Sequence, residues 1–209
     1  QHGVSIDMPA GPSEVLVIAD EAAIPEFAAS DLLSQAEHGT DSQVIFVTTS
    51  ESMAKKVNEA VYEQLKNLPR KEIATKALQN SRVIITRSID EAIELSNLYA
   101  PEHLILSCDN AEEVSGKVTN AGSVFLGNYS PESVGDYASG TNHTLPTNGY
   151  AKAHSGVSVD SFVKKITFQQ LSAEGLRNIG RATEIMAAAE GLQAHANAVS
   201  VRLKDINKR

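Results

Sequence analysis

The stretch Asn97-Leu98-Tyr99-Ala100-Pro101-Glu102-His103-Leu104-Ile105-Leu106 decides the fold, because a helical pattern ends and a strand begins within it. A residue before proline is pushed out of the helical conformation, so the helix is expected to end near Ala100. Glu102 and His103 then stand at the mouth of a strand, and open α/β sheets keep functional groups at strand ends. An imidazole exchanges protons near neutral pH, and a neighbouring carboxylate can orient it or activate water. The pair is therefore a candidate for proton chemistry, although an isolated Glu-His pair also fits an ordinary surface junction.

Apolar runs and helical spacing alternate on both sides of this stretch. Strands are predicted at residues 14–19, 43–49, 82–86, 103–107 and 122–127, and the unbroken apolar character of the first is typical of a strand covered on both faces. Helices are predicted at residues 24–38, after Ser50, and at residues 71–78, 89–99 and 111–117. This alternation predicts an α/β fold, a Rossmann-like parallel sheet with helices on both faces and right-handed crossovers.

The last third of the chain has a different character. Residues 128–158 are dominated by Gly, Ser, Thr, Asn, Pro and Tyr, and predict a long functional loop, since disordered segments are poor in aromatic residues. Residues 162–171 are expected to be extended. Ser172 is expected to cap a helix that ends near Ala189, and a second helix is expected at residues 192–206. We therefore divide the chain into a Rossmann-like domain at residues 1–157 and a mainly helical tail at residues 158–209.

The composition is that of an ordinary soluble protein, with 209 residues, 42% of them hydrophobic, and a net charge of −8. This charge argues against a general nucleic-acid binder, and neither a membrane-spanning run nor a signal peptide is visible. The single cysteine, Cys108, excludes an internal disulfide framework and fits the cytoplasm. The chain begins Gln1-His2-Gly3 without an initiator Met, so it is expected to be processed or cut from a longer protein.

Most of the polar side chains with chemical capacity fall at the ends of elements or in the long loop. They are Gln35, His38, Glu102, His103, Asp136, His143, Glu190 and His195. Imidazole, carboxylate and amide oxygen together suit zinc or a similar divalent ion. No HExxH and no Cys pair is present, so each histidine taken singly fits a packed or solvated residue better than a metal ligand. The chain also has no GxGxxG motif and no P-loop, and so shows no phosphate-binding motif of its own.

Several segments taken together resemble one known family. GPSEVL (11–16), LSQAEHG (33–39), APEHL (100–104), GSVFLG (122–127) and GDYASGTNHTLPT (135–147) resemble the histidinol dehydrogenases in order and in spacing. EGLQAH (190–195) is similar to the carboxy-terminal signature of that family. The resemblance extends over essentially the whole chain.

The resemblance implies an enzyme that completes histidine biosynthesis. Such an enzyme oxidises L-histidinol through the aldehyde to L-histidine and reduces two NAD. By the same resemblance, zinc is held by Gln35, His38, Asp136 and His195, the last from the partner subunit of a homodimer. The metal then anchors the imidazole and the amino group of the substrate, or polarises the alcohol oxygen directly; both roles stay open.

The resemblance also assigns roles to individual residues. It implies that His103 takes the alcohol proton as the hydride leaves, and that Glu102 activates water for attack on the aldehyde. Ser13 and Glu190 are expected to contact the substrate, together with His103 and the zinc ligands. His143 is a weaker candidate for the same pocket.

The chain departs from the family in its length. Members of the family are roughly twice as long, and the half without a counterpart here supplies most of the nicotinamide-binding domain. We therefore expect a fragment that is inactive by itself, and the NAD-binding residues are unknown. Two other functions stay open, namely a zinc hydrolase in which Glu102 activates a metal-bound water, and a module that only binds metal and histidinol. The expected location is the cytoplasm, or a plastid if the source is a plant.

Overall fold

The computed structural model describes residues 8–9 and 11–208. Gln1-His2-Gly3, the start from which processing was expected, lies outside the described residues. The chain divides into two compact units, Gln1–Val163 and Lys164–Arg209, whereas the sequence suggested a boundary after residue 157. The two units are described separately.

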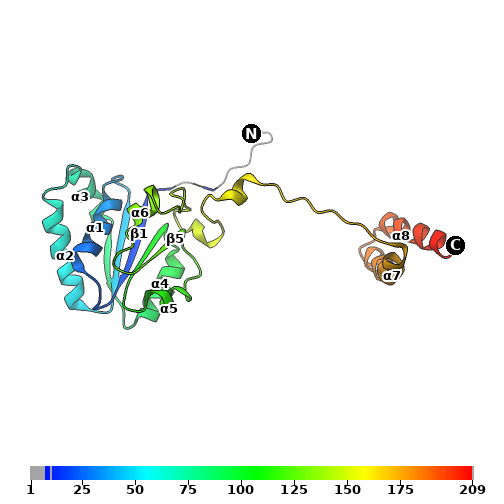
Figure 1. Ribbon diagram of the computed structural model, residues 1–209, viewed down its shortest axis with the longest axis horizontal. Coiled ribbons are helices and arrows are strands. Elements are labelled where there is room, and N and C mark those ends of the chain that lie inside the picture. Colours follow the sequence, from blue (N-terminus) through cyan, green and yellow to red (C-terminus); the bar gives the residue numbers. More distant parts are fainter. Residues whose placement is uncertain (1–7, 10, 209) are drawn as a thin grey trace. The chain divides into compact units, whose positions relative to one another are not determined.

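The first unit is built on a parallel sheet, drawn in Figure 1. Within the described residues, five strands lie in the order β3-β2-β1-β4-β5. The strands are β1 (Glu14–Ala19), β2 (Gln43–Thr48), β3 (Arg82–Ile85), β4 (His103–Ser107) and β5 (Ser123–Leu126). All four pairings are parallel, and Val15 lies opposite His103 in the register of β1 and β4. The predicted α/β fold with a parallel, Rossmann-like sheet is confirmed.

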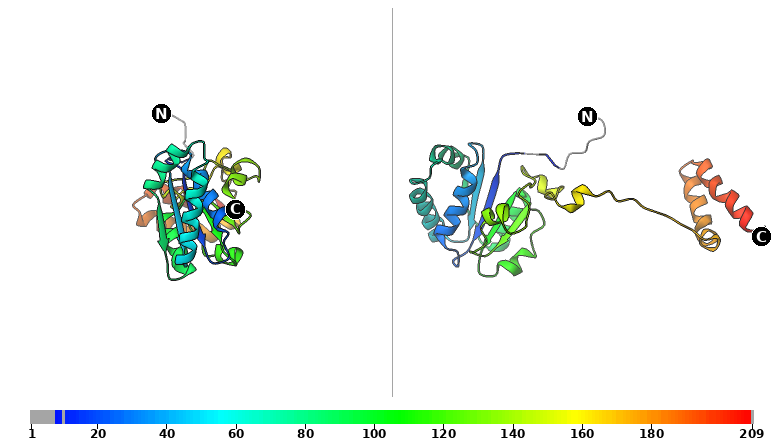
Figure 2. Two further views of the ribbon diagram at one scale, coloured as in Figure 1. Left: turned by 90° about the vertical axis from the view of Figure 1, so that its left-hand side faces the viewer. Right: turned by 45° about the horizontal axis from the view of Figure 1, so that its top comes forward.

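Helices cover both faces of this sheet (Figures 1 and 2). On one face lie α1 (Pro25–Ala36), α2 (Glu51–Leu65) and α3 (Lys71–Gln79), and on the other lie α4 (Ile89–Tyr99) and α5 (Ala111–Ser115). Strand side chains alternate between the two cores, as strand geometry requires. Val15 and Val17 pack on the α1 side, whereas Leu16 and Ile18 pack on the α4 side.

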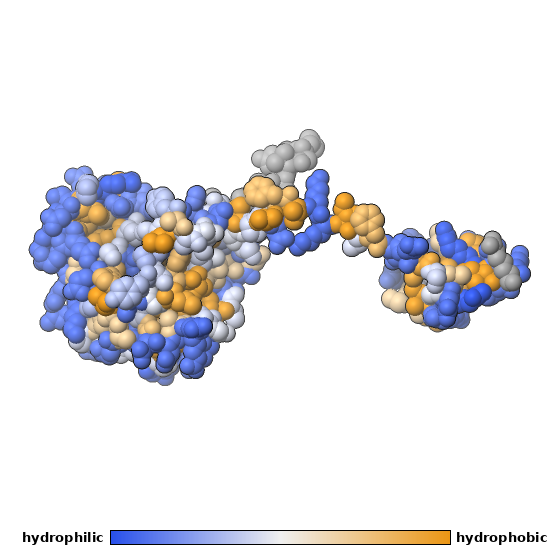
Figure 3. Space-filling view, in the orientation of Figure 1, coloured by the Kyte–Doolittle hydropathy of each residue, from blue (hydrophilic) through white to orange (hydrophobic). Residues whose placement is uncertain are grey.

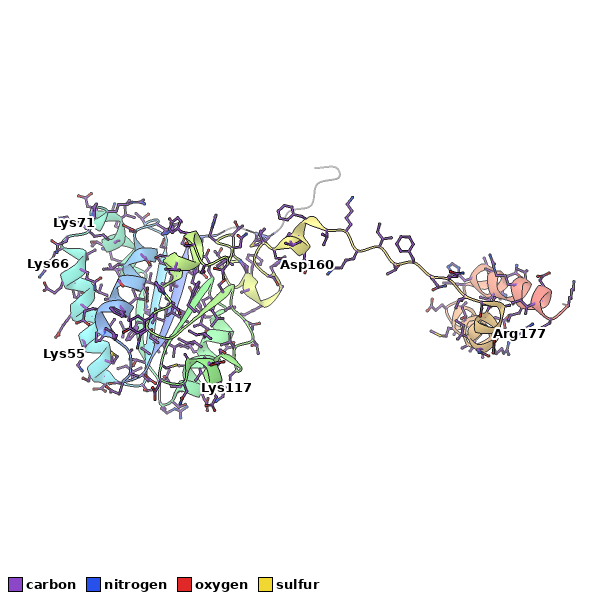
Figure 4. All side chains as sticks on the ribbon, viewed as in Figure 1. Lys55, Lys66, Lys71, Lys117, Asp160 and Arg177 are labelled. Atoms are coloured by element: carbon purple, nitrogen blue, oxygen red, sulfur yellow. The ribbon has the colours of Figure 1, made fainter. Side chains whose placement is uncertain are left out.

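Local signals in the sequence mark where several helices begin. The hydroxyls of Ser50, Ser88 and Ser172 accept hydrogen bonds from the first turns of α2, α4 and α7 (Ala173–Ala189), as predicted for N-cap residues. The outer side of α2 and α3 is polar, and Lys55, Lys66 and Lys71 point away from the sheet in Figure 4. Apolar residues at helical spacing therefore face the sheet while charged ones face water.

The prediction that residues 128–158 form one long loop is wrong in part. The segment contains α6 (Glu132–Tyr137) and the short 3-10 helix η1 (Tyr150–Lys152), and the 3-10 helix η2 (Val159–Phe162) follows it. Helix α6 is too short to display a hydrophobic period, and Gly135 lies within it, so its sequence has the composition of a loop.

The second unit is a pair of helices, α7 (Ala173–Ala189) and α8 (Gln193–Ile206). Gly191 joins them with a φ of 74°, a left-handed conformation that glycine adopts without strain. Much apolar surface stays exposed on this unit, including Ile185 and Met186, and Figure 3 shows hydrophobic residues on its surface. Within the described residues, none of the helices combines the length and apolar character that a bilayer crossing requires.

Candidate active site

The junction between α4 and β4 delivers Glu102 and His103 into the interior. Helix α4 ends at Tyr99 and is capped by Ala100, which has a φ of 58° and donates its backbone N–H to the Ser96 carbonyl at 2.7 Å. An alanine in this left-handed region costs about 1–2 kcal/mol, which the buried surroundings of the turn must offset. After Pro101, the Glu102 and His103 residues are only 7% and 3% exposed. The predicted surface alternative for this pair is therefore excluded.

One residue of the neighbouring strand holds both side chains. The backbone N–H of Glu14 donates to Glu102 Oε2 at 2.9 Å, and the Glu14 carbonyl lies 3.0 Å from His103 Nδ1. A carbonyl oxygen can only accept, so Nδ1 carries the hydrogen and Nε2 of the neutral ring is left as the acceptor. His103 Nε2 is buried and has no hydrogen-bond partner among the described residues.

Two carboxylates from α6 face this free nitrogen. Asp136 Oδ1 lies 3.6 Å and Glu132 Oε2 lies 3.9 Å from His103 Nε2. One ligand-type atom from each of His103, Glu132 and Asp136 lies within 4.8 Å of the others, a geometry in which a metal ion could be held. Imidazole and carboxylate ligands suit zinc and related divalent ions.

Gln35 joins the same cluster from the last turn of α1. Its side chain is 1% exposed, and its Nε2 donates to Glu132 Oε2. Its Oε1 is buried without a hydrogen-bond partner among the described residues. The structure therefore brings together four residues that the sequence singled out, namely Gln35, Glu102, His103 and Asp136.

The other residues singled out from the sequence lie outside this cluster or in the second unit. His38 follows α1 with an exposed side chain, and its carbonyl accepts from Arg70 Nη2 at 3.3 Å. Ser13 is half-buried just before β1, and His143 is exposed. Glu190 and His195 are exposed on the second unit, whose position relative to the first is not determined.

Burial dominates the electrostatics of the acidic groups here. Desolvation raises the pKa of Glu102 to about 7, against the lowering effects of the His103 imidazole and the Glu14 N–H. Desolvation, followed by the charge of Glu132, raises the pKa of Asp31 to about 7. Desolvation also raises the pKa of Glu14, whose Oε1 accepts from the Asn148 N–H at 2.9 Å. A carboxyl poised near neutral pH is suited to accept a proton from water.

The cluster lies at the opposite edge of the sheet from the one where the general rule for open α/β sheets would place a site. Ligands of open α/β sheets usually bind outside the carboxyl ends of the strands. Here Glu14 and His103 are the first residues of β1 and β4, so the cluster lies at the amino ends. The last turn of α1 reaches this edge because α1 runs back toward the start of β2, which brings Gln35 with it.

Glu132 is the residue of this cluster that the sequence interpretation missed. It is 2% exposed and contacts both Gln35 and His103. The spacing of Glu132 and Asp136, four residues apart, would place both carboxylates on one face of a helix. The four-residue spacing is visible in the sequence, but it predicts a pair of neighbouring carboxylates only if the segment is helical.

Comparisons with known proteins place these observations in a family. The sequence model of the family described as "Histidinol dehydrogenase" matches residues 1–203. The "Histidinol dehydrogenase" of Bacteroides thetaiotaomicron is 63% identical over 203 residues, which are 97% of this chain and 47% of that protein. The "Histidinol dehydrogenase, chloroplastic" of Arabidopsis thaliana is 59% identical over 207 residues, 99% of this chain and 44% of that protein.

A solved structure gives the same result. The crystal structure of histidinol dehydrogenase from Elizabethkingia anophelis superposes with a TM-score of 0.95 at 64% identity. The match covers 98% of this chain and 47% of the solved chain. The present chain therefore spans about half the length of the relatives it matches.

Proposed function

This chain belongs to the histidinol dehydrogenase family, and from that premise we propose that it carries the metal and substrate site of an enzyme that oxidises L-histidinol to L-histidine. The proposed reaction is the last step of histidine biosynthesis, two oxidations by way of histidinaldehyde, each reducing one NAD. The observation that supports it is the buried convergence of His103, Glu132 and Asp136, with Glu102 alongside.

The donor atoms of the cluster fit zinc. Gln35 Oε1 is buried without a hydrogen-bond partner among the described residues, and Asp136 lies in the same cluster, with its Oδ1 3.6 Å from His103 Nε2. We assign these two residues as zinc ligands. We also assign His38, which lies outside the cluster and follows Gln35 by three residues, and His195 from the partner subunit. When bound, zinc supplies a positive charge that anchors the imidazole and amino group of histidinol.

His103 is the proposed base for the first oxidation. Its Nδ1–H is fixed on the Glu14 carbonyl, so its Nε2 lone pair is free to take the proton of the alcohol. As that proton moves to Nε2, the hydride on the same carbon leaves for NAD and the carbon–oxygen double bond forms. Proton and hydride thus leave together and the aldehyde results.

Glu102 is the proposed base for the second oxidation. Its carboxylate takes a proton from water while the water oxygen bonds to the aldehyde carbon. The product of this attack is the anion of the hydrate, which can then lose a hydride to the second NAD and become the carboxylic acid. The raised pKa of Glu102, about 7, gives it enough basicity for this step near neutral pH.

Ser13 and Glu190 are the further proposed substrate contacts, and His143 is a weaker candidate. The position of Ser13 supports its role as a substrate contact, because Ser13 directly precedes Glu14, whose backbone contacts both Glu102 and His103. No NAD-binding residue is assigned in this chain. Most of the cofactor contacts are proposed to lie in the part of the relatives that this chain does not span.

A homodimer is proposed, with Glu190 and His195 acting across the interface. The two-helix unit supports this, because so small a unit rarely keeps a sufficient core and this one exposes Ile179, Ile185 and Met186. The proposed location is the cytoplasm, or the plastid in a plant. A chloroplastic relative from Arabidopsis thaliana supports the second case.

The proposal is tested by following NADH formation from histidinol and NAD in the intact protein. His103→Ala is expected to lower turnover by about 10²–10⁴-fold and to leave the zinc content unchanged. His154→Ala, at an exposed imidazole, is the matched control and is expected to retain full turnover.

Other outcomes point to other functions. Absence of histidinol-dependent NADH formation would contradict the dehydrogenase and favour a zinc hydrolase. Binding of histidinol in calorimetry without turnover would favour a binding module. Loss of zinc in His103→Ala would show that His103 is a metal ligand and contradict its role as a base.

A further inference from the structure

The Glu132 carboxylate is the most completely bonded group in the cluster. Its Oε1 accepts from Ser133 Oγ at 3.0 Å and lies 2.8 Å from Ser34 Oγ, which shares its single hydrogen with the Asp31 carbonyl at 2.7 Å. Its Oε2 accepts from the Nε2 of Gln35. Each oxygen therefore already has a donor from the protein, and the whole residue is 2% exposed.

This bonding fixes the orientation of the Gln35 amide. A carboxylate can only accept, so the NH₂ group of Gln35 must face Glu132 and the amide oxygen must face away from it. That oxygen is buried and has no hydrogen-bond partner among the described residues. A rotation of the amide by half a turn would place two acceptors against each other, so it is strongly disfavoured.

We propose that Glu132 is a positioning residue that presents the Gln35 oxygen to the metal ion, a role that rests on the proposed zinc site. Glu132 acts through Gln35 and is not itself a ligand. Partners that orient the ligands of a metal are a general feature of such sites, and losing one costs about 10–100-fold in metal affinity.

The competing role is direct ligation, since Glu132 Oε2 lies 3.9 Å from His103 Nε2. The two roles differ in whether Glu132 needs Gln35. A positioning residue loses its effect once Gln35 is removed, whereas a ligand keeps it. A double-mutant cycle on zinc affinity therefore separates the two roles.

The test measures the Kd for Zn²⁺ by calorimetry in the full chain for Glu132→Leu, Gln35→Ala and the double variant. Glu132→Leu removes the acceptor and keeps much of the volume, and is expected to weaken binding by about 10–100-fold. In the Gln35→Ala background the same change is expected to have no further effect. Glu132→Gln keeps an acceptor for the Gln35 NH₂ group and is expected to retain most of the affinity. Ser34→Ala is the control, because it removes a bond to Oε1 and leaves the Gln35 bond in place.

A second measurement covers the case in which Glu132→Leu does not fold. The ¹⁵N side-chain amide signals of Gln35, assigned by their loss in Gln35→Ala, report the hydrogen bond without any metal. They are expected to show slow hydrogen exchange, and to shift in Glu132→Gln because the acceptor loses its charge.

The outcomes separate this inference from the proposed function. Additive losses in the cycle would overturn the positioning role and assign Glu132 as a ligand. A loss in Glu132→Leu that accompanies unfolding, together with Gln35 signals that do not move in Glu132→Gln, would show a merely structural role. Failure of the unsubstituted protein to bind Zn²⁺ would overturn the zinc site itself, and the inference with it.

Discussion

Glu102 is buried next to the His103 imidazole. Burial and the imidazole have opposite effects on the pKa of Glu102, and this pKa sets the pH range in which Glu102 can accept a proton. Desolvation raises its pKa to about 7, although the His103 ring favours the carboxylate. A base must be ionised to accept a proton, so oxidation of the aldehyde is expected to fall about tenfold per pH unit below pH 7. The measurement is the pH profile of NADH formation from histidinaldehyde. A rate that stays constant from pH 7 to pH 5 would contradict the role of Glu102.

Glu102→Gln sharpens this test. The amide cannot take the proton from water, so the variant is expected to lose aldehyde oxidation by about 10²–10⁴-fold and the pH dependence of that step. A single turnover from alcohol to aldehyde is expected to survive, because His103 is the proposed base for that step. Equal loss of both steps would show that Glu102 acts in both.

Asp31 is a second buried acid, and its effect is on stability. It is 7% exposed, and burial followed by the charge of Glu132 raises its pKa to about 7. Because this folded-state pKa lies above the unfolded value, the folded protein holds the proton more tightly. The resulting stability is fully present below about pH 4 and is lost as the pH rises through 7.

Asp31→Asn is therefore expected to unfold with the same free energy as the unsubstituted protein near pH 4. It is expected to be more stable at pH 8, on the order of 2–4 kcal/mol. Urea unfolding followed across this pH range provides the measurement. Asp109→Asn, at an exposed position, is the matched control and is expected to follow the unsubstituted protein. Identical curves for Asp31→Asn and the unsubstituted chain would contradict the prediction.

At the scale of elements, α6 depends on one close contact with the sheet. A methyl group at Gly135 would lie 2.5 Å from Phe125 Cε1 and 2.9 Å from Phe125 Cζ. Phe125 in turn packs near His103, with ring centroids 6.0 Å apart. Glycine thus lets α6 approach β5 closely enough to bring Asp136 to the His103 ring.

Gly135→Ala is expected to destabilise the first unit by about 1–3 kcal/mol, because the overpacking outweighs the better helix propensity of alanine. Turnover is expected to fall as well, since Asp136 moves with α6. Thermal unfolding and NADH formation are the measurements. Gly116→Ala is the control, because its methyl group would meet only the Glu113 carbonyl at 3.4 Å. A Gly135→Ala protein with unchanged stability and turnover would contradict this account of α6.

The elements that the sequence predicted well are those whose signals are local. Strand β1 is a continuous apolar run. Ser88 caps the start of α4 and Pro101 stops it, so the bounds of both elements can be predicted from short stretches of sequence. Helix α6 lacks such signals, because its position depends on packing between Gly135 and Phe125. Glu132 was not predicted as a site residue because it lies on α6, which the sequence did not reveal as a helix. The predicted strands already began at Glu14 and His103, which places both residues at the amino ends of a parallel sheet, although the general rule for open α/β sheets favours the carboxyl ends.

At the scale of the whole molecule, the two units differ in how they are stabilised. The first has an apolar core on each face of its sheet. The second exposes Ile179, Ile185 and Met186 on a helix that buries few side chains. Because burial of apolar area is the main stabilising contribution, the second unit requires another surface to cover it. A partner subunit supplies such a surface if the homodimer forms as proposed.

Complementation between two inactive variants tests whether the second unit works across that interface. His103→Ala lacks the proposed base, and His195→Ala lacks the proposed ligand from the partner, so each homodimer is expected to have less than about 1% of normal turnover. A mixed dimer with His195 acting in trans has one site that lacks both residues and one site that is intact. Random reassembly of equal amounts makes half of the dimers mixed, so about a quarter of normal turnover is expected to return. If His195 served its own subunit, each site of the mixed dimer would lack one residue, and mixing would restore nothing. NADH formation measured after the two variants are unfolded and refolded together distinguishes these outcomes, with separately refolded samples as the control.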